Sequence, residues 1–79
     1  MILIIGGNSQ GKLKFAKELL SIGDDLVTDG GTCEFDRAFD RPVLNHLHLL
    51  IRRMKQQGLD VYGIVRQGIE RNPEITIIC

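Results

Sequence analysis

The first residues of the chain read MILIIGGNSQGK (Met1–Lys12), and this stretch decides which fold the remaining residues can build. Ile2–Ile5 is an unbroken aliphatic run, mostly β-branched, which favours a strand. A run without alternating polar residues is typical of a strand buried on both faces, as in a parallel sheet covered by helices. Gly6 and Gly7 end the run, and Leu13–Ile22 has the apolar spacing of a helix. The order strand, glycine-rich turn, helix therefore predicts an α/β fold.

The turn between this strand and this helix has the spacing G-x-x-x-x-G-K, from Gly6 to Lys12. In a phosphate-binding loop (P-loop), the glycines let backbone N–H groups point at a phosphate, and the helix N-terminus adds positive potential. The lysine reaches the β- and γ-phosphates. We therefore predict a nucleotide-binding loop that takes GTP or ATP, with Lys12 in a catalytic role. The predicted nucleotide-binding residues are Gly6, Gly7, Asn8, Ser9, Gln10, Gly11, Lys12 and Leu13.

One position departs from this motif. P-loops carry Ser or Thr directly after the lysine, because that hydroxyl holds Mg²⁺ beside the β- and γ-phosphates. This chain has Leu13 there, which leaves Mg²⁺ binding and Mg²⁺-dependent phosphoryl transfer in doubt. Besides an active transferase, two interpretations stay open. The chain is a degenerate P-loop module that binds nucleotide without turning it over, or the turn serves packing only.

Length and composition narrow the fold and the partners. A chain of 79 residues forms at most one small domain. Because each βαβ unit takes about 30 residues, we expect residues 1–79 to form a single, partial P-loop domain. The predicted fold is a small, truncated three-layer α/β domain, P-loop NTPase-like, with about three parallel strands and helices on both faces. Ten basic and ten acidic side chains cancel, so neither nucleic acid nor an anionic membrane is an expected partner.

Two further features bear on location and metal binding. The apolar run Met1–Ile5 is too short for a signal peptide or a membrane span, which predicts a cytoplasmic protein. Cys33 and Cys79 lie far apart and have no metal-ligand spacing around them. No metal site is predicted, and two free thiols suit a reducing compartment.

A second polar turn follows the next apolar stretch. Asp25–Asp29 has the composition of a short strand between turn residues. If it runs parallel to the first strand, Asp29 emerges at the same edge as the glycine loop, where ligands of open α/β sheets bind. Asp29 is therefore a candidate for substrate contact or for water-mediated contact with a metal. The alternative is an ordinary turn residue before Gly30 and Gly31.

The clearest helical periodicity spans Val43–Gln57, with Pro42 in the first turn. On that helix His46 and His48 flank the apolar stripe on opposite sides, so they cannot chelate one metal together. They are boundary residues, or one of them is a nucleophile or general base. Gly58 is expected to end the helix. A further helix to about Arg71 and a buried third strand at Glu74–Cys79 complete the predicted elements.

Near the end of the predicted helix, Arg52 and Arg53 with Lys55 form a short basic patch. A solvated patch suits the negative end of the helix dipole. The alternative is a clamp for phosphate or carboxylate.

Several segments together carry a resemblance to a known family. They are Met1–Gly7 with Gly11–Lys12, Asp29–Cys33, Val43–Leu49, Arg52–Arg53 and Asn72–Cys79. On these segments the chain resembles the N-terminal part, in a short branch, of the adenosylcobinamide kinase/adenosylcobinamide-phosphate guanylyltransferase family of cobalamin biosynthesis.

The resemblance implies an ATP- or GTP-dependent transferase. Family members phosphorylate the aminopropanol hydroxyl of adenosylcobinamide and then transfer GMP through a guanylate carried by a histidine. Carried over by position, Gly6, Gly7, Gly11 and Lys12 would hold phosphates, and His46 would accept the guanylate. Adenosylcobinamide would be the partner besides the nucleotide. Self-association is also expected, because the third strand and Leu49 leave apolar surface uncovered in so short a chain.

Overall fold

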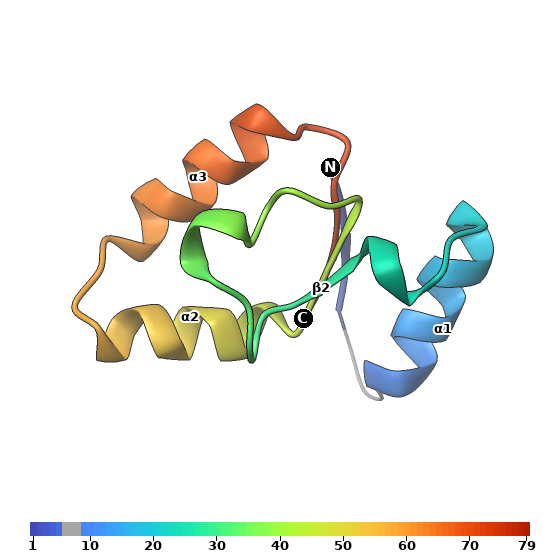
Figure 1. The fold of residues 1–79 in the computed structure, drawn as a ribbon, viewed down its shortest axis with the longest axis horizontal. Coiled ribbons are helices and arrows are strands. Elements are labelled where there is room, and N and C mark those ends of the chain that lie inside the picture. Colours follow the sequence, from blue (N-terminus) through green and yellow to red (C-terminus); the bar gives the residue numbers. More distant parts are fainter. Residues whose placement is uncertain (6–8) are drawn as a thin grey trace.

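A computed structural model describes residues 1–5 and 9–79 (Figure 1). These residues contain a parallel four-stranded sheet in the order β1-β4-β3-β2. The strands are β1 (Ile2–Ile4), β2 (Val27–Asp29), β3 (Val43–Asn45) and β4 (Thr76–Ile78). The helices are α1 (Ser9–Leu20), α2 (Leu47–Gln56) and α3 (Val61–Arg71), with 3₁₀ turns η1 (Asp24–Leu26) and η2 (Phe35–Arg37). The predicted α/β class with a parallel sheet is confirmed.

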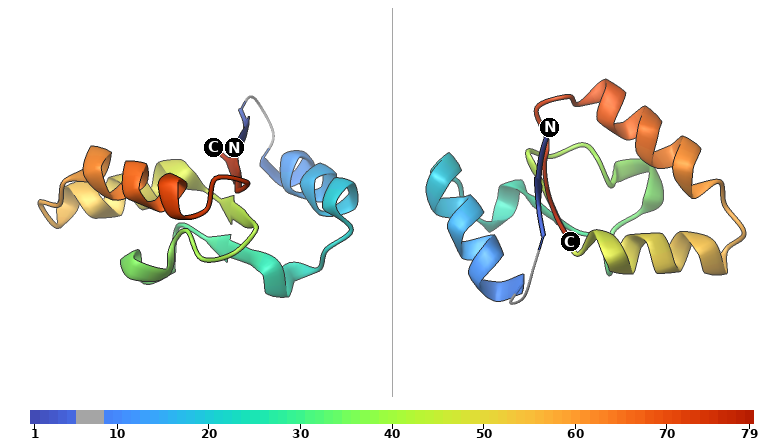
Figure 2. Two further views of the ribbon diagram at one scale, coloured as in Figure 1. Left: turned by 90° about the horizontal axis from the view of Figure 1, so that it is seen from above. Right: turned by 180° about the vertical axis from the view of Figure 1, so that it is seen from behind.

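The helices cover both faces of the sheet (Figures 1 and 2). α1 lies on one face, and α2 and α3 lie together on the other, as the edge-on view of the strands shows. The larger core fills the space between the sheet and α2 and α3; its buried residues are Ala38, Phe39, Leu44, Leu50, Met54, Ile75 and Ile77. The smaller core lies under α1; its buried residues are Ala16, Val43 and Ile78. Burial of both faces explains why the central strands β3 and β4 carry consecutive apolar residues, Val43–Leu44 and Ile77–Ile78, instead of alternating apolar and polar ones.

β3 corrects the predicted start of the helix that follows it. Residues 43–45 form strand β3, whereas a helix was predicted from Val43. β3 pairs with β2 on one side and β4 on the other, and Val43 and Leu44 are fully buried there. A short apolar run fits the helical and the extended period equally well, so only pairing with two neighbours decides between them. The sheet therefore has four strands in the described residues, not about three.

The position of β1 is a second correction. β1 was predicted to be buried on both faces, but it is an edge strand that pairs only with β4. Ile2 is 48% exposed and Leu3 is 50% exposed. β4 is buried between β1 and β3, as predicted for the strand at Glu74–Cys79, so the apolar surface that was expected to stay uncovered there is covered. Exposed apolar side chains lie on β1 and on α1, which presents Phe15 and Leu19 to solvent, and Tyr62 of α3 is exposed as well.

The connection between α2 and α3 follows local rules. Gly58 has a positive φ of 72°, which ends α2 as predicted, because glycine adopts this conformation without a steric penalty. Asp60 begins α3, and its side chain accepts a hydrogen bond from the N–H of Gly63 at 3.1 Å. In the part of the chain that the structure describes, no helix is long and apolar enough to cross a membrane.

Candidate functional site

The strands of the parallel sheet end at a common edge. Asp29 closes β2, Asn45 closes β3, and the two residues pair in register. His46 follows Asn45 directly, and Cys79 follows β4. Ligands of open parallel sheets bind outside the carboxyl ends of the strands. This edge is therefore the candidate site.

β1 ends at Ile4 and α1 begins at Ser9, so the glycine-rich stretch lies between these two elements in the sequence. Three of its predicted binding residues, Gly6, Gly7 and Asn8, lie outside the described residues. α1 begins at Ser9 rather than at Leu13, so Ser9, Gln10, Gly11 and Lys12 form its first turn. The helix N-terminus, with its positive potential, therefore lies directly after the loop.

Lys12 and Leu13 point to different environments. The Lys12 ammonium donates a hydrogen bond to the backbone oxygen of Cys79, just beyond the end of β4. Its charge is thereby held at the carboxyl edge of the sheet. Leu13 packs against the smaller core, beside Ala16 and Ile78. The position at which a P-loop carries its Mg²⁺-binding hydroxyl is used here for apolar packing.

Asp29 and His46 form a pair of polar side chains at this edge. His46 Nδ1 lies 3.0 Å from Asp29 Oδ1. The same oxygen accepts the backbone N–H of Gly31 at 2.9 Å. The hydrogen bond from His46 and then that from Gly31 lower the pKa of the Asp29 carboxyl, against the opposing effect of partial burial. Asp29 is therefore a carboxylate at neutral pH, and the pair spans the ends of β2 and β3.

His46 has an unusual backbone conformation. Its φ of 60° and ψ of 48° are left-handed, which is uncommon for a residue with a side chain. This residue separates β3 from α2, where its carbonyl accepts the first helical N–H groups, those of Leu49 and Leu50. The predicted position of His46 on a helix face is therefore wrong. The ring of His46 makes no capping hydrogen bond to α2, so it can bond to Asp29.

Gly30 brings the two strand ends into contact. Its N–H donates to the carbonyl of Asn45 at 2.8 Å. A Cβ at this position would lie 2.5 Å from the His46 carbonyl oxygen, which belongs to the backbone and cannot move aside. Glycine is thus required here, and its absent side chain lets Asp29 approach His46.

Arg53 of α2 secures the turn after Asp29. Its guanidinium donates to the carbonyl of Gly30 and to that of Cys33, both at 2.8 Å. It also lies over the ring of Phe35, 4.8 Å from the centroid. The side chain of Cys33, whose carbonyl accepts one of these bonds, is partly buried. This burial raises the pKa of the Cys33 thiol, which stays protonated at neutral pH. From the sequence, Arg53 was interpreted either as a solvated side chain at the end of the helix or as a clamp for an anion. Its contacts with the described residues show instead that it binds two backbone carbonyls.

We expect Arg53→Lys to destabilise the protein by about 1–2 kcal/mol, because an ammonium cannot hold two carbonyls in a planar fork or stack on Phe35. The matched control is Arg52→Lys on the same helix, where the side chain is exposed and a change within about 0.5 kcal/mol is expected. Urea denaturation followed by circular dichroism measures both values. Equal stability of the two variants would contradict this role of Arg53.

Asn45 is a residue of the edge that sequence reasoning missed. Its side chain is buried, and its Oδ1 has no hydrogen-bond partner among the described residues. Buried polar atoms without a partner are uncommon in folded proteins. If Val43–Asn45 had been interpreted as a strand, Asn45 would have stood out as a polar residue at the end of a buried strand, at the edge where ligands bind. The helical interpretation concealed it.

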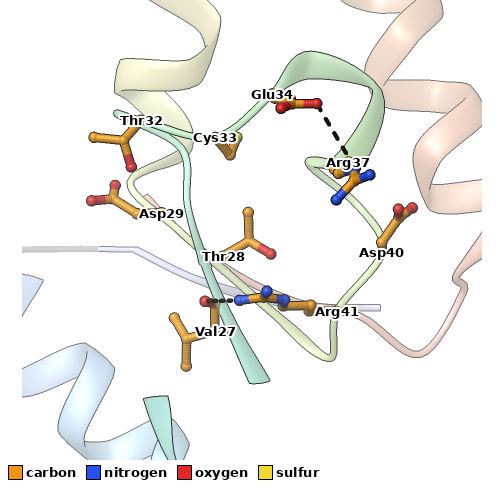
Figure 3. A pocket seen from close by; sticks show the side chains of 9 residues that line it. All are labelled: Val27, Thr28, Asp29, Thr32, Cys33, Glu34, Arg37, Asp40 and Arg41. Atoms are coloured by element: carbon orange, nitrogen blue, oxygen red, sulfur yellow. Dashed lines mark hydrogen bonds and ion pairs between the residues drawn. The ribbon is translucent and has the colours of Figure 1, made fainter. Parts of the chain in front are cut away.

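A hollow of about 600 Å³ lies beside Asp29 (Figure 3). The loop from β2 to β3 surrounds it, and Figure 3 shows Arg37 and Asp40 on the side opposite Asp29. Its lining residues are Val27, Thr28, Asp29, Thr32, Cys33, Glu34, Arg37, Asp40 and Arg41. Arg41 donates to the carbonyl of Val27 at 3.2 Å, which anchors the far end of the loop. The hollow thus offers both charge signs and hydroxyl groups next to the Asp29–His46 pair.

The predicted site residues fall into two groups along the edge. Lys12 lies at the end of β4, whereas Asp29 and His46 meet at the ends of β2 and β3. Comparison of the chain with profiles of known protein families, with curated proteins and with solved structures found no match. The resemblance to the cobinamide kinase/guanylyltransferase family therefore stays a prediction.

Proposed function

We propose that this protein binds a nucleoside triphosphate at the carboxyl edge of its sheet and transfers the nucleotidyl group, GMP from GTP, through His46. The observation that carries the proposal is the hydrogen bond between His46 and Asp29 at the edge where Lys12 and the first turn of α1 also lie. A histidine oriented by a carboxylate is a recurring arrangement for nucleophilic catalysis.

The two groups of residues have separate roles in this proposal. Lys12 and the N-terminus of α1 neutralise the negative charge of the phosphates, which favours binding and stabilises charge on the leaving group. His46 supplies the nucleophile. The acceptor implied by the resemblance is adenosylcobinamide phosphate, and the hollow beside Asp29 offers room for a polar acceptor group.

The family's other reaction, phosphorylation of the aminopropanol hydroxyl, requires an Mg²⁺ ligand that Leu13 does not provide. Because the side chain of Leu13 packs in the smaller core, that position contributes to stability instead. The proposal therefore assigns nucleotidyl transfer to the chain ahead of the kinase step. The two free thiols, Cys33 and Cys79, suit a reducing, cytoplasmic setting.

The test is self-labelling with α-³²P-GTP. We expect stable incorporation of label from the α-phosphate and none from γ-³²P-GTP, and the bond should be labile in acid, as a phosphoramidate is. His46→Asn should abolish the label while keeping the fold, since asparagine tolerates the left-handed conformation of residue 46. His48→Asn is the matched control, because its ring lies 5.9 Å from that of His46 and it should label normally.

Label on the His46→Asn variant would overturn transfer through His46, and no label on the parent would overturn nucleotidyl transfer itself. A second function is favoured by the packing of Leu13: a degenerate P-loop module that holds nucleotide without turnover. Nucleotide-induced thermal stabilisation without any label on the parent protein would establish that module in place of the enzyme.

A further inference from the structure

We propose that Asp29 is the positioning residue of His46, and that it holds the imidazole with its proton on Nδ1 so that Nε2 is the reacting atom. This inference rests on the proposed function, because it names the atom of His46 that accepts the nucleotidyl group. Its central claim, the tautomer of His46, is measurable on the protein without any substrate.

The hydrogen bond to Asp29 determines which ring nitrogen of His46 has a free lone pair. A carboxylate has no proton to give, so Nδ1–H of His46 donates to Asp29 Oδ1 across 3.0 Å. In a neutral imidazole the other nitrogen, Nε2, then carries the lone pair. No side chain among the described residues is bonded to Nε2, and the ring is 30% exposed. Nε2 is therefore the nitrogen that an incoming phosphate group meets.

Both partners are held before any ligand binds. Asp29 Oδ1 also accepts the N–H of Gly31, which fixes the carboxylate relative to its own turn. Arg53 holds that turn through the carbonyl of Gly30. His46 is held by its carbonyl, which accepts the first hydrogen bonds of α2. A left-handed non-glycine residue is strained and persists where the surroundings impose it, often at functional sites.

The step balances without an additional reactant. The Nε2 lone pair attacks the α-phosphorus of the nucleoside triphosphate, an N–P bond forms, and the bond from the α-phosphorus to the bridging oxygen breaks. Pyrophosphate leaves with that electron pair. The ring keeps its Nδ1 proton and gains a positive charge, which the Asp29 carboxylate offsets. In the second step a phosphate oxygen of the acceptor attacks the phosphorus, a P–O–P linkage forms, the N–P bond breaks, and its electron pair returns to Nε2.

The test is nitrogen-15 NMR of the histidine side chains in the full chain, above the pH at which they titrate. We expect His46 in the Nδ1–H form, with the exposed His48 as the reference in the same spectrum. In Asp29→Asn the amide can donate to Nδ1, so His46 should shift toward the Nε2–H form. His46 found in the Nε2–H form in the parent would overturn the proposal, whatever the variant does.

The kinetic arm uses the rate of labelling by α-³²P-GTP. Asp29→Asn should slow it by about 10²–10⁴-fold, the range seen when a histidine is held in the wrong tautomer. Asp36→Asn is the control, because Asp36 is exposed and lies outside the lining of the hollow, and its rate should be unchanged. An unchanged tautomer in Asp29→Asn, or an unchanged rate, would refute the positioning role. If the parent does not label at all, the proposed function fails, and the tautomer still decides whether Asp29 orients His46.

Discussion

Replacement of Lys12 by alanine is expected to remove most of the thermal stabilisation that GTP gives the protein. At a ligand concentration about 100 times Kd, binding stabilises the native state by about 2.7 kcal/mol. For a domain of this size that corresponds to a rise in Tm of roughly 10–20 °C. Removal of a cation that pairs with phosphate costs about 2–5 kcal/mol of binding free energy, which weakens binding by about 30-fold or more. The shift should therefore fall to about a third of its value or less at the same GTP concentration.

The matched control is Lys14→Ala, two residues further along α1. Lys14 is exposed, so its loss changes the net charge equally but should leave the GTP-induced shift intact. Because Lys12 also holds the backbone oxygen of Cys79, its removal lowers Tm without ligand. The quantity to compare is therefore the difference in Tm with and without GTP, measured for each variant by differential scanning fluorimetry. Equal shifts in the two variants would show that Lys12 does not bind the nucleotide.

The second large effect is on stability. Leu50→Ala is expected to cost about 2–5 kcal/mol, the usual range for removing a fully buried leucine. Leu50 lies on α2 in the larger core, and its Cβ sits directly beneath Gly30. A domain of 79 residues is stable by roughly 4–12 kcal/mol, so this substitution removes a large part of the total. We also expect the turn after Asp29 to loosen, because Leu50 supports it from below.

Leu19→Ala makes the same chemical change on another helix. Leu19 is 60% exposed whereas Leu50 is 0% exposed, and both positions are helical, so helix propensity changes equally. Leu19→Ala should alter stability by no more than about 0.5 kcal/mol. Chemical denaturation monitored by circular dichroism gives both free energies of unfolding. A cost at Leu19 that matches the cost at Leu50 would mean that α1 is covered in solution by something beyond the described residues.

β3 is the element whose type was predicted wrongly from the sequence. Val43 and Leu44 precede a strongly periodic helix, and their spacing continues its apolar stripe. They form a strand because β2 and β4 hydrogen-bond to them on both sides. The residues near Val43 in sequence do not indicate that these two strands will be its neighbours. The same error displaced His46 from the loop to a helix face. By contrast, α3 matches its predicted range, since its signals are local: Asp60 at its start and the residues before Pro73 at its end.

The candidate site was foreseen in part for a related reason. Glycine spacing, the strand before it and the helix after it place Lys12 at the carboxyl edge through chain connectivity alone. Asp29 was expected at that edge from the direction of its strand, and it lies there. The contact between Asp29 and His46 joins residues on separate strands and depends on Gly30 and on the backbone conformation of His46. Arg53 and Asn45 were not foreseen, because their roles depend on neighbours distant in sequence.

The sequence by itself therefore determined the α/β class, the helix after the glycine loop and the edge at which the polar residues gather, because these follow from periodicity, turn chemistry and chain direction. Only the tertiary structure decided that β1 lies at the edge of the sheet, that Val43–Asn45 is a strand, and that Leu13 packs into the core. Only the tertiary structure paired Asp29 with His46 as well. The physical reason is that strand order and cross-strand contacts depend on which distant segments compete for the same hydrogen bonds and the same buried surface, and no local pattern encodes that competition.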